Sequence, residues 1–204
     1  MKLVGMLDSP YVRRVAVSLK LLGLSYEHQP LSVFRAFEEF SAINPVVKAP
    51  TFVCDDGVVL MDSTLILQYA EALARPCTLT PSRPKELERE LRLIGLALAA
   101  CEKTVQIVYE RTQRPPEKLH QPWIDRVTGQ LLAAYDALEQ EVARDAPSLA
   151  SEAITQAAVT IAVGWDFTQG RLPEIVPAAR FPALDGFSEE AESLPEFRAA
   201  RTPA

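Results

Sequence analysis

The chain has 204 residues, of which 48% are hydrophobic, enough apolar surface for one large domain or two small ones. Its formal net charge of −6 and the absence of a basic stripe argue against a nucleic-acid partner. The N-terminal MKLVGMLDSP does not have the pattern of a signal peptide, and no apolar run reaches the roughly 18 residues of a membrane span, so we expect a cytoplasmic protein without a membrane partner.

The first 74 residues have the pattern of a mixed sheet with helices. An apolar strand is expected at residues 2–7, and Pro10 then opens a helix whose apolar face ends at Gly23. A second strand is expected at 26–31, and Ser32 is expected to cap a helix through Phe40. Asp56-Gly57 predicts a hairpin between strands at 51–54 and 58–61.

Beyond Ala74 the pattern becomes helical. Prolines between Arg75 and Pro84 indicate a linker, so we place two domains at residues 1–76 and 84–204. Periodic stretches predict helices at 86–111, 122–142 and 154–167, and a short last helix after Leu194. The second domain is therefore expected to be an all-α bundle.

Two motifs in the first domain indicate a binding site for a peptide-like ligand. Because Pro50 cannot donate to a strand ladder, the preceding Ala49 can offer its backbone groups to a ligand. Asp62-Ser63 places a carboxylate, a hydroxyl and free N–H groups at a helix N-terminus, which suits the ammonium and α-carboxylate of an amino acid. An ordinary turn and an ordinary N-cap are the alternative interpretations.

The order of these elements and motifs resembles the N-terminal domain of glutathione S-transferases. The segment Ser9-Pro10-Tyr11-Val12-Arg13-Arg14 is similar to the Ser-Pro-Phe-Val-Arg-Lys stretch of bacterial, serine-type members. The resemblance implies an α/β thioredoxin-like domain with a cis peptide bond before Pro50, followed by an all-α helical bundle. It also implies an alkyl or aryl glutathione transferase that conjugates glutathione, its co-substrate, to small hydrophobic electrophiles without a further cofactor.

The resemblance also implies roles for individual residues. Ala49 and Pro50 match the positions that hold the cysteinyl part of glutathione, and Asp62-Ser63 matches the pair that holds its γ-glutamyl end. Arg35 and Lys48 are candidates for contacting the glycyl carboxylate, although a solvated charge is the favoured alternative for Arg35. The expected glutathione-binding residues are Ser9, Arg35, Lys48, Ala49, Pro50, Asp62 and Ser63.

Catalysis by such a protein depends on the thiol proton. A free thiol has a pKa near about 8.5, so only roughly a few per cent is thiolate at neutral pH. Ser9 could donate a hydrogen bond to the sulfur while the helix that starts at Pro10 adds partial positive charge. We expect Ser9 to be catalytic, with a plain N-cap as the alternative. Tyr11 could activate the thiol instead, although its position favours the electrophile pocket or the core.

The electrophile pocket is expected between the domains. Its candidate lining residues are Tyr11, Val105, Val108 and Tyr109, with Trp165 more distant. No metal site is predicted, because His28 and His120 are isolated. The three cysteines form no C-x-x-C pair and none stands near position 9, so redox or mixed-disulfide chemistry is not expected.

Two other functions stay open. One is a non-catalytic glutathione-binding or protein-interaction module with the same fold. The other is a thiol-dependent isomerase of the maleylacetoacetate type, whose Ser-Ser-Cys-like signature is missing near Ser9. A homodimer is implied by the family, with apolar candidates at Leu65, Leu91 and Leu96.

A helix that ends in Gly164-Trp165-Asp166-Phe167 resembles the sixth helix of bacterial members. Such helices begin with a Ser/Thr-x-x-Asp capping box, whereas here Thr155 is followed by Ala158, so Ser151 is an alternative start.

Overall fold

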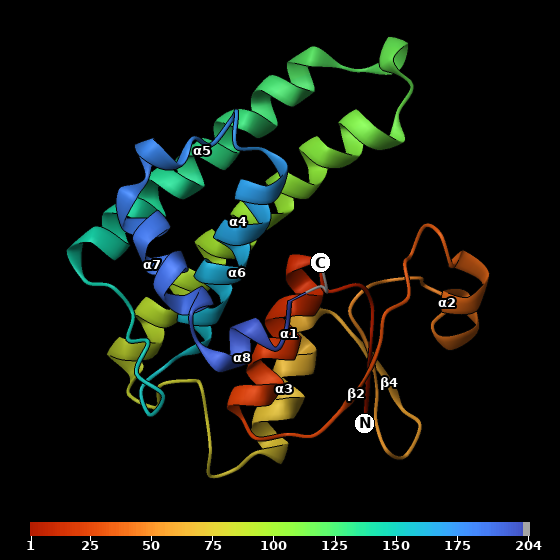
Figure 1. Cartoon of the computed structure of the whole chain (residues 1–204), viewed down its shortest axis with the longest axis vertical. Helices are drawn as coiled ribbons and strands as arrows, with labels where there is room; N and C mark the ends of the chain where they lie inside the picture. Colours follow the sequence, from red (N-terminus) through yellow and green to blue (C-terminus); the bar gives the residue numbers. More distant parts are fainter. Residues whose placement is uncertain (202–204) are drawn as a thin grey trace. The chain divides into compact units, whose positions relative to one another are not determined.

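The computed structural model describes residues 1–201, and its internal contacts divide the chain into two units. The first contains residues 1–79 and the segment that begins at Ser193, and the second contains residues 80–192. Figure 1 shows the strands within the first unit and the long helices within the second.

A four-stranded mixed sheet forms the centre of the first unit, in the order β2-β1-β3-β4. The strands are β1 (Lys2–Val4), β2 (Glu27–Gln29), β3 (Thr51–Val53) and β4 (Val59–Met61). Strands β1 and β2 are parallel, whereas β3 is antiparallel to both of its neighbours, with Thr51 opposite Val4 and Met61. The predicted mixed sheet and the hairpin are confirmed.

Two helices, α1 (Pro10–Leu21) and α3 (Ser63–Leu73), lie side by side in this unit (Figure 1). Helix α1 begins where Pro10 presets the first turn, and it buries Val12, Val15 and Leu19 completely. It ends at Leu21, shortly before the predicted Gly23, which has a φ of +69° that a glycine adopts without strain.

The helix expected from Ser32 is shorter than predicted. Helix α2 covers only Phe37–Ile43, and residues 33–36 form a turn before it. The Ser32 hydroxyl accepts hydrogen bonds from the N–H groups of Phe34 and Arg35, so it caps this turn as predicted, although the regular helix begins later. Of the three phenylalanines in the segment only Phe40 is buried.

The second unit is helical, as predicted. Its helices are α4 (Pro84–Gln113), α5 (Gln121–Arg144), α6 (Gln156–Arg171) and α7 (Pro182–Glu192), with 3-10 turns at Pro116–Lys118 and Ala178–Arg180. Tyr135, Trp165 and Phe181 pack in its core with ring centroids 5.2 to 5.9 Å apart. Burial raises the pKa of Tyr135 well above its ordinary value, and its hydroxyl donates to Thr168 Oγ1 at 2.6 Å.

The predicted last helix is present as α8 (Pro195–Arg198), and its contacts belong to the first unit. Arg13, 5% exposed, donates from Nε to the Ala200 carbonyl at 3.1 Å and from Nη2 to the Phe197 carbonyl at 3.4 Å. Contacts therefore group the tail with residues 1–79, whereas the domain limits 1–76 and 84–204 remain a proposal.

Helix α6 begins after Thr155, and the alternative start at Ser151 is wrong, because residues 151–153 form a turn. The Thr155 hydroxyl makes no capping hydrogen bond. Instead the buried Glu90 carboxylate of α4 accepts a hydrogen bond from Ala157 N at 2.5 Å. A residue of another helix thus supplies the carboxylate that the local capping box lacks.

Candidate functional site

Ser9 precedes the first turn of α1, with extended backbone angles of φ −80° and ψ 126°. Its N–H donates to the Met6 carbonyl at 3.1 Å, but its hydroxyl does not cap the helix. The side chain is half-buried, and its hydroxyl makes no hydrogen bond to any residue between 1 and 201. Ser9 therefore presents an uncommitted donor at the positive end of a 12-residue helix.

The loop before β3 carries Ala49, and the peptide bond between Ala49 and Pro50 is cis, as the resemblance implies. Side chains hold the loop: Thr51 Oγ1 donates to the Lys48 carbonyl at 2.7 Å and accepts from Asn44 Nδ2 at 2.8 Å. Val47 has a φ of +51°, an uncommon conformation for a β-branched residue. Within the described part of the chain, the Ala49 backbone groups make no hydrogen bond, so they can pair with a ligand.

Gly5 is a residue that the sequence analysis missed. It follows β1 with a φ of +137°, and a Cβ built on it would lie 2.7 Å from Val12 Cγ2 and 3.2 Å from Ala49 Cβ. The missing side chain therefore lets the Ala49 loop approach the start of α1. A glycine between an apolar strand and a helix start was the available signal.

The N-terminus of α3 carries the Asp62-Ser63 pair. Asp62 has a φ of +71°, and its Oδ1 accepts a hydrogen bond from Thr64 N at 2.9 Å. Such backbone strain in a non-glycine residue costs about 1–3 kcal/mol and occurs preferentially at ligand sites. The Ser63 hydroxyl accepts a hydrogen bond from Arg14 Nη1 at 3.1 Å, so Arg14 is a second residue that the sequence analysis missed.

Helix α1 is the element that these groups share. Ser9 stands at its start, Val12 borders the Gly5 backbone that Ala49 also approaches, and Arg14 reaches Ser63 at the start of α3. Arg35 and Lys48 are exposed, and no contact in the described residues joins either side chain to this group.

The candidate electrophile residues are divided between the units. Tyr11 is half-buried in the first unit. Val105, Val108 and Tyr109 occupy one face of α4 in the second unit and are partly exposed, Tyr109 to 44%. The more distant candidate, Trp165, is only 2% exposed and donates from Nε1 to Asp185 Oδ1, so its side chain belongs to the core of the second unit.

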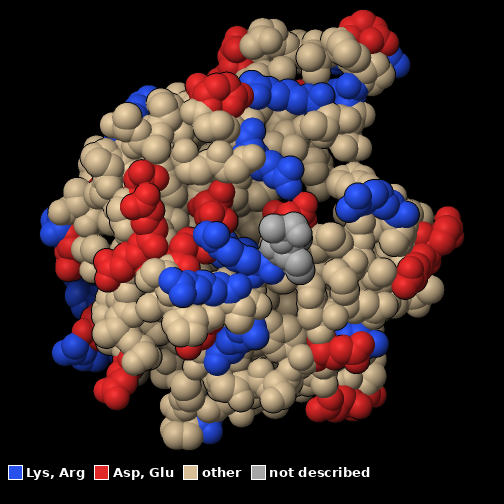
Figure 2. Space-filling view, in the orientation of Figure 1, with Lys and Arg blue, Asp and Glu red and all other residues tan. Residues whose placement is uncertain are grey.

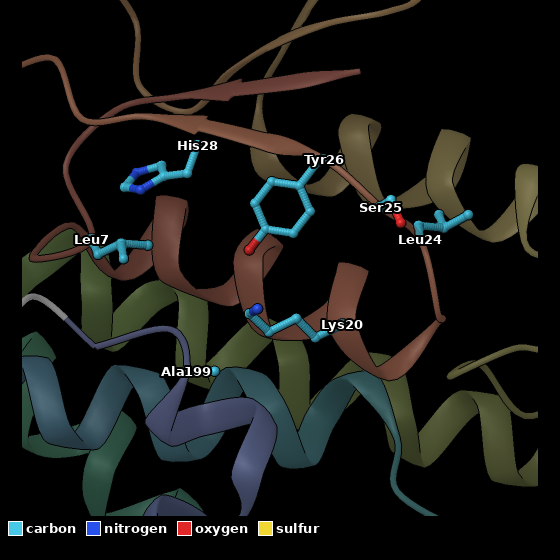
Figure 3. A pocket seen from close by; sticks show the side chains of 7 residues that line it. All are labelled: Leu7, Lys20, Leu24, Ser25, Tyr26, His28 and Ala199. Carbon is cyan, nitrogen blue, oxygen red and sulfur yellow. The ribbon is translucent and has the colours of Figure 1, made fainter.

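A separate pocket of about 390 Å³ lies in the first unit beside the C-terminal half of α1 (Figure 3). Its lining residues are Leu7, Lys20, Leu24, Ser25, Tyr26, His28 and Ala199, of which only Leu7 falls in the loop at residues 6–11 that was expected to line the electrophile pocket. Its polar groups are partly engaged with the protein, because the Tyr26 hydroxyl donates to the Ala16 carbonyl and His28 Nε2 bonds the Gly5 carbonyl at 2.8 Å. Burial also raises the pKa of Tyr26.

Basic and acidic side chains are interspersed on the face that Figure 2 shows. In the described residues, no group of three or more His, Cys, Asp or Glu side chains is arranged to hold a metal ion. None of the helices in residues 1–201 is both long enough and apolar enough to cross a membrane.

Comparison with known proteins identifies the first unit. Residues 3–78 match the family model described as the glutathione S-transferase N-terminal domain. The match assigns residues 3–78 to the glutathione S-transferase N-terminal domain. The whole chain is similar in fold to a glutathione transferase family member from Pseudomonas fluorescens Pf-5, solved with bound glutathione. That protein is 28% identical and has a TM-score of 0.86 over 100% of this chain and 99% of that chain. The predicted glutathione S-transferase fold is thus confirmed.

Of two curated relatives, one has a named reaction and the other is uncharacterized. The uncharacterized GST-like protein YibF of Escherichia coli (strain K12) is 27% identical over 139 residues, 68% of each chain. A maleylacetoacetate isomerase of Pseudomonas aeruginosa is 29% identical over 146 residues, 68% of this chain and 69% of the relative. The relatives therefore agree on the family and leave the reaction open.

Proposed function

We propose that the chain is a glutathione transferase that activates the glutathione thiol and conjugates it to small hydrophobic electrophiles. The observation that carries this proposal is the half-buried, uncommitted hydroxyl of Ser9 at the N-terminus of α1. A hydrogen bond from this hydroxyl and the partial positive charge of the helix end both favour a thiolate. Ser9 keeps its own proton in this role, so its function is to lower the thiol pKa.

The rest of glutathione is assigned to the groups around α1. The free backbone groups of Ala49 pair with the cysteinyl residue beside Pro50, and Asp62 with Ser63 holds the γ-glutamyl ammonium and carboxylate. Arg35 and Lys48 are exposed cations that suit the glycyl carboxylate.

The second substrate is assigned to partly exposed apolar groups. Tyr11 and the Val105, Val108 and Tyr109 face of α4 supply apolar and aromatic surface without a charged side chain among them. A cytoplasmic homodimer belongs to the same proposal, supported by the exposed Leu65 and Leu91 side chains, each 58% exposed.

The experiment compares wild type with Ser9→Ala by calorimetric titration of glutathione and by the ultraviolet absorbance of the bound thiolate as pH is varied. Ser9→Ala should raise the bound-thiol pKa by about one to two pH units, which corresponds to about 1.4–2.7 kcal/mol, and slow conjugation accordingly. Ser25→Ala, in the pocket of Figure 3, is the matched control and should change neither quantity. An unchanged thiol pKa in Ser9→Ala would exclude the role of Ser9.

Isomerisation is a second candidate, favoured by the similarity to the maleylacetoacetate isomerase of Pseudomonas aeruginosa. Such a reaction adds the glutathione thiolate to a conjugated double bond and later expels it, so it needs the same activated sulfur. Purified protein should be assayed with maleylacetoacetate beside a panel of aryl halides. Conversion without consumption of glutathione would favour the isomerase, and glutathione binding without a thiolate signal would favour a non-catalytic module.

A further inference from the structure

Arg14 is a buried cation in the middle of α1. Only 2% of the residue is exposed, and its Nη1 donates to Ser63 Oγ at 3.1 Å and to Thr64 Oγ1 at 3.3 Å. These hydroxyls belong to the first two residues of α3, the helix that lies beside α1 in Figure 1. The guanidinium therefore lies beneath the helix end to which the γ-glutamyl group is assigned.

This contact determines which way the Ser63 hydroxyl can donate. Because Ser63 Oγ accepts from Arg14, its own proton must point elsewhere, and a hydroxyl that accepts a charged hydrogen bond becomes a stronger donor. Ser63 is itself only 3% exposed, so its hydroxyl is fixed in a region of low dielectric.

Charge balance at this helix end leads to the same role. Asp62 contributes a carboxylate beside the γ-glutamyl position, which attracts an ammonium and repels a carboxylate. The buried guanidinium of Arg14 contributes the opposite charge behind Ser63, and the α3 N-terminus adds partial positive charge. The site therefore favours the ammonium of an amino acid beside Asp62 and its carboxylate beside Ser63.

The neighbouring arginine has a different task, although it is buried on the same helix. Arg13 donates to the carbonyls of Ala200 and Phe197, so it holds the C-terminal segment. The two residues therefore form a natural pair in which one buried arginine faces α3 and the other does not.

We propose that Arg14 is a positioning residue for glutathione recognition: it orients the Ser63 hydroxyl and supplies buried positive charge, so that the α3 N-terminus selects the α-carboxylate of the γ-glutamyl group. This inference rests on the proposed function, because it assumes that glutathione binds at Asp62 and Ser63. It adds a residue that touches no substrate and acts through Ser63.

The test measures two affinities by calorimetry, for glutathione and for an analogue whose glutamyl α-carboxylate is an uncharged amide. Arg14→Gln should weaken glutathione binding roughly 10- to 100-fold, as expected for a lost charged interaction. It should weaken the amide analogue clearly less, because that ligand loses only the oriented hydroxyl and no attraction between charges. Arg13→Gln is the control and should leave the ratio of the two affinities unchanged, even if it lowers the unfolding midpoint.

A second comparison keeps the proposal testable if Arg14→Gln does not fold. Arg14→Lys keeps the positive charge but loses the planar guanidinium with its fixed hydrogen-bond donors. Ser63→Ala removes the hydroxyl that the guanidinium orients. If Arg14 acts through Ser63, Arg14→Lys weakens glutathione binding in the wild type and has no further effect in the Ser63→Ala background.

The outcomes separate this inference from the proposed function. Equal loss of both ligands in Arg14→Gln, or additive effects of Arg14→Lys and Ser63→Ala, would overturn the role of Arg14 while glutathione binding by the wild type stands. A wild-type protein that binds neither ligand would overturn the proposed function and this inference with it.

Discussion

The absence of a side chain at Gly5 allows the Ala49 loop to lie close to helix α1. The Gly5 φ of +137° is rare for other residues, and an added Cβ would meet Val12 at 2.7 Å and Ala49 at 3.2 Å. We expect Gly5→Ala to lower the free energy of unfolding by about 1–3 kcal/mol, through strain and overpacking. Because the Ala49 loop must also move away from α1, glutathione affinity should fall in the same variant, which calorimetry measures.

Gly57 provides the control for this substitution. It also has a positive φ, +87°, but a Cβ there would meet nothing within 4 Å, and it lies in the β3–β4 hairpin turn. Gly57→Ala should lower stability through backbone strain alone and leave glutathione affinity unchanged. If both variants bind glutathione like wild type, the close approach of Ala49 at Gly5 has no role in binding.

Asp62 combines a structural and a binding role that two substitutions can separate. Its carboxylate caps α3 through Thr64 N, and Asp62→Asn keeps an oxygen for this bond whereas Asp62→Ala does not. Both variants should weaken glutathione binding by about 1.5–3 kcal/mol, because the charge that attracts the glutamyl ammonium is lost. Only Asp62→Ala should also lower the thermal unfolding midpoint, and unaltered glutathione binding in both would remove Asp62 from the site.

For single residues, the sequence shows which polar groups are available to a ligand, but it does not show which residues are in contact. Ser9, Ala49 and Asp62 stand out because a residue before a helix, before a proline or at a cap has free polar groups. The contact between Arg14 and Ser63 spans 49 positions, and no local pattern shows which turn of α1 faces α3. The signal that was available is the charged Arg14 between the apolar residues Val12 and Val15, both of which are buried.

Among the secondary-structure elements, some helices begin at a residue that the local sequence identifies and others do not. Pro10 and Pro84 open α1 and α4, because proline fits the first turn of a helix. The start of α6 depends instead on Glu90, which is 67 positions away from Ala157 in the chain. A capping residue on another helix has no local sequence signature, so the missing capping box at Thr155 suggested a different start.

The α6 cap can be tested by Glu90→Gln. Glutamine keeps an acceptor oxygen but removes the charge that favours a helix N-terminus, so we expect a loss of about 1–2 kcal/mol in the free energy of unfolding. Urea unfolding followed by circular dichroism measures this loss. Glu88→Gln, on the same helix and paired with the exposed Lys85, is the control and should change stability by less than about 0.5 kcal/mol. Equal effects of the two substitutions would argue against a special role of Glu90.

For the whole molecule, the division into a mixed-sheet unit and a helical unit could be expected from the loss of strand alternation beyond Ala74. The grouping of the C-terminal segment with the first unit could not, because it depends on Arg13 bonding to carbonyl groups almost the length of the chain away. Backbone acceptors carry no residue-specific signal. Such a contact is visible only in the folded chain.

The stability of the helical unit should depend on pH through Glu141. Its carboxylate accepts a hydrogen bond from Arg92 Nε at 3.1 Å and is also paired with Arg144. The hydrogen bond from Arg92 is the main cause that lowers the pKa of Glu141 below its ordinary value of 4.5. A carboxyl whose folded-state pKa is depressed stabilises the fold above its unfolded-state pKa, and this contribution is lost as pH falls through the folded-state value.

Glu141→Gln should therefore lower the free energy of unfolding at neutral pH, by about 1 kcal/mol or less, because the Arg92 and Arg144 side chains are 59% and 68% exposed and water screens the pairs. The difference from wild type should shrink as pH falls below 4.5 and vanish once Glu141 is protonated in the folded protein. Urea unfolding at a series of pH values measures it. A difference that persisted in acid would show that the variant loses packing or geometry at this position, since a protonated Glu141 and a glutamine carry the same charge.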